Sequence, residues 1–254
     1  MQILRSILFV FVACTIYLAS YAQDDTQKFR ALQLSCSRVS LACTHCDDTL
    51  NKYFEKRGLS YPPKDIYLRA FKSQNEMELW ARNDDTMPYK LVKIYHICAL
   101  SGILGPKRWE GDRQVPEGFY FIEEFNPKSE YYLSLLINYP NYSDSVLGGD
   151  IKLGGNIYIH GGCVTIGCMP MTNEIMQELY VVCLNAKLNG ENYIPVHIYP
   201  TRFTRPAMNY LSREYGRDVE KQKFWATLKE NYDYFEKYHK LLPVMYAQDG
   251  KYAN

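Results

Sequence analysis

Residues 157–179 of the chain read IYIHGGCVTIGCMPMTNEIMQEL. The short apolar stretch that leads into His160 and a glycine pair predicts a strand that ends in a tight turn. Thr172 then precedes apolar residues at helical spacing, which predicts a helix as far as Lys187 with that threonine as its N-cap. The segment therefore places His160 and Cys168 on the two sides of one strand–turn–helix junction.

His160 and Cys168 are the residue types of a general base and a nucleophile. The thiolate is the reactive form of cysteine, and a helix N-terminus directly after Cys168 would favour it through its positive partial charge. A histidine just upstream, beyond a glycine turn, is placed to accept the thiol proton. Gly167 lets neighbouring backbone N–H groups face an incoming carbonyl oxygen, as an oxyanion hole requires. The alternative is a structural cysteine with a core histidine at a strand end.

The rest of the chain predicts one α+β domain with helical segments at both ends. Residues 101–118 are rich in glycine, proline and charge, which predicts a long binding loop, and residues 138–155 are also loop-like. Apolar periodicity predicts helices over 27–57 and within 206–242, and strands over 66–71, 76–82, 91–99, 118–125, 131–138 and 194–199.

The N-terminus has the pattern of an export signal. Arg5 precedes an apolar run over residues 7–18, and Ser20 and Ala22 are small residues suited to a cleavage site. An uncleaved signal anchor is the alternative. We therefore expect a mature protein in the periplasm or cell envelope without an integral membrane segment. The expected organisation is a signal peptide over 1–22, a helical and strand extension over 23–88, a catalytic domain over 89–200 and a helical appendage over 201–254.

Composition narrows the class of ligand. The formal net charge is +1, so no global electrostatic field favours nucleic acid as a partner. The 23 tyrosines suit contact with peptides and sugars, although tyrosine is also a strand former. The chain has no phosphate loop, no GxGxxG and no HExxH, so we expect no cofactor and no metal.

The cysteines suit an exported protein with one reactive thiol. Of eight cysteines, Cys14 lies in the apolar run, and the odd number that follows it leaves at least one unpaired. Cys43 and Cys46 are expected to be structural or locally bridged. Cys163 and Cys183 are either core thiols or a bridge that braces the turn before Cys168, and Cys98 lies on a strand pattern and is expected in the core.

Four motifs, in order along the chain, carry a resemblance to a known family. They are Val115-Pro116-Glu117-Gly118-Phe119-Tyr120, Tyr132-Leu133-Ser134-Leu135 with Asn138-Tyr139-Pro140, Ile159-His160-Gly161, and Thr165-Ile166-Gly167-Cys168. Over about residues 89–199 the chain resembles the YkuD-type L,D-transpeptidase catalytic domain, and most closely its YafK-like branch. Ile166 and Pro170 stand where the main family has a histidine and an arginine.

The resemblance implies a mixed, curved β core and acyl chemistry on peptidoglycan stem peptides. Cys168 would attack the carbonyl that follows the L-centre of diaminopimelate in a stem tetrapeptide, and His160 would accept the thiol proton. The Gly161 backbone would orient the imidazole, and the N–H groups near Gly167 would hold the oxyanion. Residues expected to contact substrate are Thr165, Tyr132, Tyr120 and, from the charged loop, Arg113.

Two alternatives to a transpeptidase keep peptidoglycan as the ligand. The first is a hydrolase with the same residues, either an L,D-carboxypeptidase or an amidase that acts at diaminopimelate. It differs from a transpeptidase only in the acceptor of the acyl group. The second is a non-catalytic peptidoglycan-binding module, in which Cys168 would be unreactive.

Overall fold

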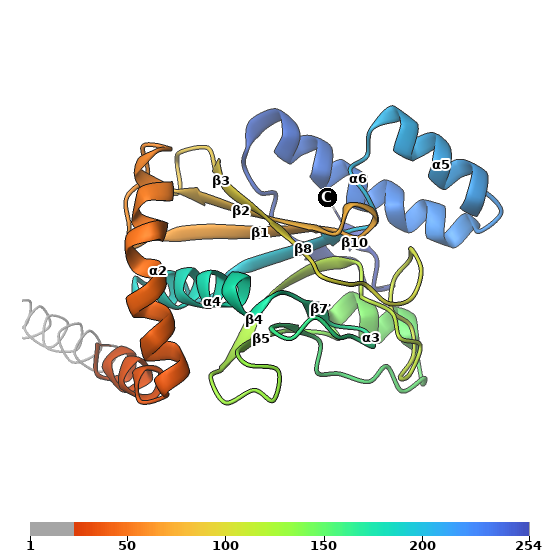
Figure 1. Cartoon of the computed structure of the whole chain (residues 1–254). Helices are drawn as coiled ribbons and strands as arrows, with labels where there is room; N and C mark the ends of the chain where they lie inside the picture. The colour runs from red at the N-terminus through yellow and green to blue at the C-terminus, as the bar shows by residue number, and fades with distance from the viewer. Residues whose placement is uncertain (1–22, 254) are drawn as a thin grey trace, which may run out of the picture.

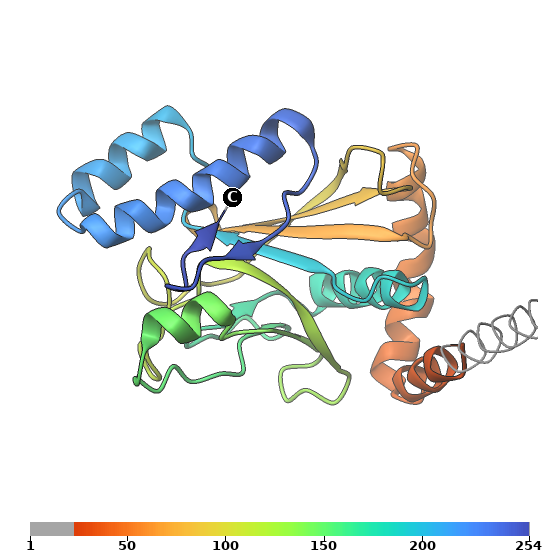
Figure 2. The same cartoon turned by 180° about the vertical axis from the view of Figure 1, so that it is seen from behind.

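Eight strands form one mixed sheet, and helices pack on both of its faces (Figures 1 and 2). The computed structural model describes residues 23–253. The expected signal peptide, residues 1–22, lies outside the described residues. In sheet order the strands are β3 (Lys90–His96), β2 (Glu76–Arg82), β1 (Asp65–Phe71), β8 (Pro195–Tyr199), β4 (Gly118–Asn126), β5 (Ser134–Ile137), β6 (Tyr158–His160) and β7 (Met169–Pro170).

The helices form two layers, one on each face of the sheet. Residues 23–34 are helical and lead into the first layer, and a small hairpin of two strands closes the C-terminus. The elements are α2 (Ser37–Glu55) and α4 (Asn173–Leu188) in the first layer, α5 (Arg205–Tyr215) and α6 (Val219–Tyr238) in the second, α3 (Tyr142–Gly148) between β5 and β6, and the hairpin of β9 (Met245–Tyr246) and β10 (Tyr252–Ala253).

Strand β1 shows why both layers are needed. Its side chains are almost all buried, and successive side chains along a strand point to opposite faces. Ile66 and Leu68 belong to the large core that contains residues of α2 and α4. Tyr67 packs with Phe235 of α6, and Phe71 packs with Tyr232 of the same helix. The C-terminal helices therefore cover a sheet face that would otherwise expose large aromatic side chains.

Two sequence predictions need correction here. Residues 138–155 are not wholly loop, because Asn141 and Asp144 form a reciprocal capping box that starts α3. The helix expected over 27–57 is interrupted at residues 35–36, and α2 begins after Cys36. The boundary expected at 89 falls between β2 and β3, which pair antiparallel within the one sheet.

The loop over residues 101–117 is fixed to the sheet by a buried ion pair. Lys72 Nζ lies 2.9 Å from Glu117 Oε1 and also donates to the carbonyl oxygens of Ile103, Gly105 and Val115. Trp225 of α6 donates its indole N–H to Glu117 Oε2 at 2.6 Å. Neither charged side chain is appreciably exposed, so the pair has to be satisfied by these partners. The long loop is thereby held in one position beside the candidate site.

Cys98 and Cys163 form a disulfide between the segment that follows β3 and the turn that follows β6. Cys98 is therefore not the free core thiol that we expected. Of the two alternatives for Cys163, a core thiol or a bridge, the bridge is present, but its partner is Cys98 and not Cys183, which is free and fully buried. Cys43 and Cys46 are also unbridged. The disulfide ties one end of the turn that contains Cys168 to the main sheet.

No helix within residues 23–253 is both long enough and apolar enough to span a membrane.

Candidate active site

Strands β6 and β7 place the segments of His160 and Cys168 side by side. The two strands pair in parallel, with Ile159 opposite Met169. Ile159 and Met169 both face the core and are fully buried. Because side chains alternate along a strand, we expect His160 and Cys168, which flank this pair, to share the other face. The Cys168 thiol itself donates to the Asn156 carbonyl oxygen at 3.7 Å.

The imidazole of His160 is oriented by its own neighbour. Nδ1 lies 2.6 Å from the Gly161 carbonyl oxygen, and since a carbonyl only accepts, Nδ1 carries the proton. The lone pair of the neutral ring is then on Nε2, which has no hydrogen-bond partner among residues 23–253. Burial lowers the pKa of His160, against a smaller opposing effect of the Gly161 hydrogen bond. The ring is thus neutral and able to accept a proton at pH 7.

The thiol of Cys168 is protonated at rest. Burial raises its pKa, and the N–H of Tyr158 and the positive charge of Lys107 offset this only in part. The Tyr158 N–H donates to the sulfur at 3.4 Å. The expected help from a helix N-terminus is absent, because β7 follows Cys168 and α4 begins only at Asn173. The thiolate must therefore be generated by transfer of the proton to a base.

The Thr165 hydroxyl occupies the place where we expected an oxyanion. Its oxygen accepts from the N–H of Gly167 at 3.1 Å and of Cys168 at 2.8 Å, and it donates to the Cys168 carbonyl oxygen at 2.8 Å. Both N–H groups expected to form an oxyanion hole are therefore occupied by this side chain. In this conformation Thr165 shapes the turn, and a contact with substrate requires the hydroxyl to leave the two N–H groups.

Close packing explains the glycines of the turn. A Cβ on Gly161 would lie 2.5 Å from Asn173 Oδ1 and 3.0 Å from the Tyr131 carbonyl oxygen, which no side chain tolerates. Gly167 has a φ of +143°, and a Cβ there would lie 3.2 Å from the Gln114 carbonyl oxygen. The loop over 101–117 is therefore in direct contact with the turn that presents Cys168.

The other residues expected to bind substrate lie in different environments. Tyr120 is only 3% exposed, and its hydroxyl donates to Asp144 at 2.9 Å. The Tyr120 hydroxyl is therefore engaged with Asp144 in this structure, and its contact with a substrate stays a prediction. Tyr132 packs on Gly161, but its hydroxyl accepts from Gln177 of α4 at 2.7 Å. Arg113 is exposed on the loop, one residue before Gln114.

Two residues near the candidate site, Tyr131 and Lys107, were not predicted from the sequence to belong to it. The Tyr131 ring lies 4.8 Å from the His160 ring, centroid to centroid, and is 49% exposed. Lys107 is buried, is paired with Asp112 at 2.5 Å, and affects the thiol pKa of Cys168. Tyr131 had no motif of its own, and Lys107 was one of several charges in a loop. Only the folded chain brings them to the turn.

The arrangement is suited to acyl transfer through a thioester. It has a protonated thiol, a neutral imidazole on the neighbouring strand, and a backbone N–H directed at the sulfur. The apolar side chains of Val164 and Ile166 in the turn are 55% and 80% exposed, so the approach to this turn is open. Within residues 23–253 no group of three or more acidic, histidine or cysteine side chains is arranged to hold a metal ion.

The chain belongs to the family of L,D-transpeptidase catalytic domains, YkuD, whose model matches residues 66–198. The match begins at β1 and ends in β8, so it contains both His160 and Cys168. A curated relative, "Putative L,D-transpeptidase YafK" of Escherichia coli K12, is 35% identical over 206 residues, which are 80% of this chain and 78% of that protein.

Two solved structures are partly similar to this chain. The helical cell shape determining protein Pgp2 of Campylobacter jejuni is 21% identical with a TM-score of 0.44, over 60% of this chain and 55% of that one. Bd1075 of Bdellovibrio bacteriovorus is 20% identical with a TM-score of 0.39, over 69% of this chain and 64% of that one. This chain therefore spans little more than half the length of the Campylobacter protein.

Proposed function

We propose that the protein is an envelope L,D-transpeptidase that forms a thioester between Cys168 and a peptidoglycan stem tetrapeptide. The observation that supports the proposal is the parallel register of β6 and β7, which brings the segment before Met169 alongside the strand that ends at His160, whose Nε2 has no hydrogen-bond partner among residues 23–253. Membership of the family supports the peptide substrate.

The chemistry begins with transfer of the thiol proton from Cys168 to Nε2 of His160. The sulfur then attacks the carbonyl carbon, and the tetrahedral oxyanion takes over N–H groups that Thr165 holds at rest. Collapse of this intermediate breaks the C–N bond, and the imidazolium returns its proton to the leaving D-alanine amine. An acceptor amine attacks the thioester, the new amide forms, and the thiol is regenerated.

The thiol chemistry is tested with purified mature protein on isolated sacculi and on stem tetrapeptides, with products identified by mass. Cys168→Ala and His160→Gln should each lower turnover by about a thousandfold or more, as removal of a nucleophile or its base does in comparable enzymes. Cys43→Ala, which changes a partly exposed thiol on α2, serves as the matched control. Undiminished turnover by Cys168→Ala would refute the assignment and favour a binding module.

The acceptor is tested in the same assay by adding a stem peptide with a free amine. The proposal predicts a cross-linked product and a thioester adduct on the protein when acceptor is withheld. Release of a free tripeptide acid at the same rate with and without acceptor amine would show a hydrolase. In that case Cys168 and His160 would keep their roles, and water would be the acceptor.

A further inference from the structure

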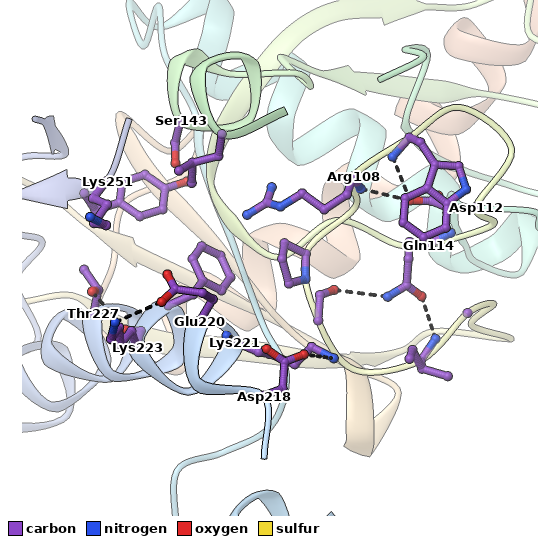
Figure 3. A pocket seen from close by; sticks show the side chains of 18 residues that line it. Arg108, Asp112, Gln114, Ser143, Asp218, Glu220, Lys221, Lys223, Thr227 and Lys251 are labelled. Carbon is purple, nitrogen blue, oxygen red and sulfur yellow. Dashed lines mark hydrogen bonds and ion pairs between the residues drawn. The ribbon is translucent and has the colours of Figure 1, made fainter. Parts of the chain in front are cut away.

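A cavity of about 720 Å³ is lined in part by the loop over residues 101–117. Figure 3 shows it between the loop, helix α6, helix α3 and the C-terminal hairpin. Gln114 borders both the cavity and the Cys168 turn, since its side chain lines the cavity while its carbonyl oxygen faces Gly167. Neither His160 nor Cys168 lines the cavity. It is therefore a separate space that shares one wall with the candidate active site.

Large apolar side chains form part of the cavity wall. Trp109 is 56% exposed and Ile103 is 62% exposed, although both are large and apolar. Phe224 of α6 and Tyr252 of the hairpin also line the cavity, and the Arg108 guanidinium lies 5.6 Å from the Phe224 ring. Exposed aromatic faces around a concave site are typical of binding sites for amphipathic ligands.

The charges around the cavity cancel in pairs. Lys221 pairs with Asp218, and Lys223 pairs with Glu220, both along α6. The remaining charged lining residues also have partners: Arg108 with Asp144, Asp112 with Lys107, and Lys251 with Asp249. No charged lining side chain is thus left to attract an ion of either sign. The chemistry favours a neutral ligand over a charged peptide or a phosphate.

Neutral hydrogen-bonding groups complete the lining. Gln114, Ser143 and Thr227 line the cavity (Figure 3). The Gln114 amide already bonds to the Gly105 carbonyl oxygen and the Ile103 N–H, and the Thr227 hydroxyl already donates to the Lys223 carbonyl oxygen. Each of these two side chains still has lone pairs that can accept a further hydrogen bond. Amides and hydroxyls are suitable partners for the hydroxyl and acetamido groups of a sugar, while its C–H faces pack on aromatic rings. The cavity is within the size range of sites for ligands of several rings.

We propose that this cavity binds the N-acetylated glycan backbone of peptidoglycan while a stem peptide occupies the Cys168 site. The inference rests on the proposed function, because only a polymer with glycan and peptide parts would need both sites. The glycan backbone is uncharged where its lactyl groups are amide-linked, whereas stem peptides carry free carboxylates and amines. A cavity whose charges are paired suits the uncharged glycan backbone and not the charged stem peptide. The shared loop would then contact both the sugar and the peptide.

The test uses the mature Cys168→Ala protein, so that no turnover disturbs binding, and calorimetric titration with a neutral N-acetylglucosamine tetramer. Saturable binding is expected. Trp109→Ala should weaken it by about five- to tenfold, as expected for one aromatic contact. Thr227→Trp, which fills the cavity from the surface of α6, should weaken it at least as much. Tyr193→Ala removes an aromatic ring that is 70% exposed and does not line the cavity, and should leave affinity unchanged.

Absence of saturable binding at millimolar tetramer would overturn the proposal. It would also be overturned if both cavity variants bound the tetramer with the same affinity as the Cys168→Ala parent. Binding of an isolated stem tetrapeptide that is lost in Trp109→Ala would also overturn it, because the occupant would then be charged. Retained turnover by Cys168→Ala on sacculi would refute the proposed function. The sugar titration would still test glycan binding by the cavity, because it does not depend on turnover. The two failures are therefore distinguishable.

Discussion

The hydroxyl oxygen of Thr165 lies 2.8 Å from the backbone nitrogen of Cys168, the residue that follows it by three positions. The same oxygen accepts a second N–H, from Gly167, and the hydroxyl hydrogen is donated to the Cys168 carbonyl. One side chain thus fixes the turn around the thiol and also occupies the donors that an oxyanion would need. At rest, the N–H groups of Gly167 and Cys168 are therefore occupied by the threonine hydroxyl.

Thr165→Val keeps the shape of the side chain and removes all three hydrogen bonds. Each lost bond costs about 1 kcal/mol, so we expect a lower midpoint of thermal unfolding and turnover reduced by tenfold or more. Thr165→Ser should keep the wild-type midpoint of thermal unfolding and the wild-type turnover, because it retains the hydroxyl. Turnover equal to or above that of the wild type in Thr165→Val would show that the hydroxyl only competes with the oxyanion.

The protonated thiol predicts how alkylation depends on pH. Burial raises the pKa of Cys168 above 9.0, so the rate of carbamidomethylation should keep rising past pH 9. The rate is followed by peptide mapping, which separates Cys168 from the other free cysteines. A plateau reached below pH 8 would instead indicate a preformed thiolate–imidazolium pair.

Turnover should fall on the acid side because His160 must be neutral to accept a proton. Burial lowers the pKa of this group below 6.5, so activity should persist to below pH 6.5 before it declines. The lowered pKa of His160 also makes the free energy of unfolding depend on pH. Below pH 6.5 the unfolded chain binds a proton at His160 more readily than the folded chain does. The stability that neutral His160 provides is therefore present above pH 6.5 and is lost as the pH falls through the lowered pKa of the folded state. Comparison of unfolding in wild type and His160→Gln at pH 5 and pH 8 measures it.

The disulfide between Cys98 and Cys163 should support the catalytic turn. Its sequence separation is 65 residues, and loops of this kind contribute about 2–4 kcal/mol to stability. The double variant Cys98→Ala/Cys163→Ala should therefore unfold at lower temperature and turn over several-fold more slowly. Dithiothreitol should reproduce both effects in the wild type and have none in the double variant. An unchanged rate in the double variant would show that the turn does not need the bridge.

The buried Lys72–Glu117 pair should be essential for stability. Glu117→Gln leaves the Lys72 ammonium buried without its counter-charge, and we expect a loss of about 3–5 kcal/mol in the free energy of unfolding. Glu220→Gln breaks the exposed pair with Lys223 and should cost less than about 1 kcal/mol. Denaturant unfolding of both variants makes the comparison, and equal losses would contradict it.

The local sequence was sufficient for the features that depend on near neighbours. The strand that ends at His160, the helix capped by Thr172 and the glycine turn before Cys168 all follow from residue types within one short segment. The α+β class followed from alternation in strands such as β1 and from helical spacing elsewhere, whereas the mixed sheet was implied by the family resemblance. Periodicity and capping act within one element, and they can therefore be recognised without knowledge of the rest of the chain.

Contacts between distant segments were decided only by the tertiary structure. Tyr120 is buried because Asp144 of α3 meets its hydroxyl, and Cys98 pairs with Cys163 because the end of β3 passes the turn after β6. The pKa of Cys168 is raised by packing from several elements, which no helix N-terminus offsets. Spacing along the chain determines which residues can meet locally. Burial, partners at long sequence separation and the resulting proton affinities depend on how the layers pack, and sequence spacing carries no information about them.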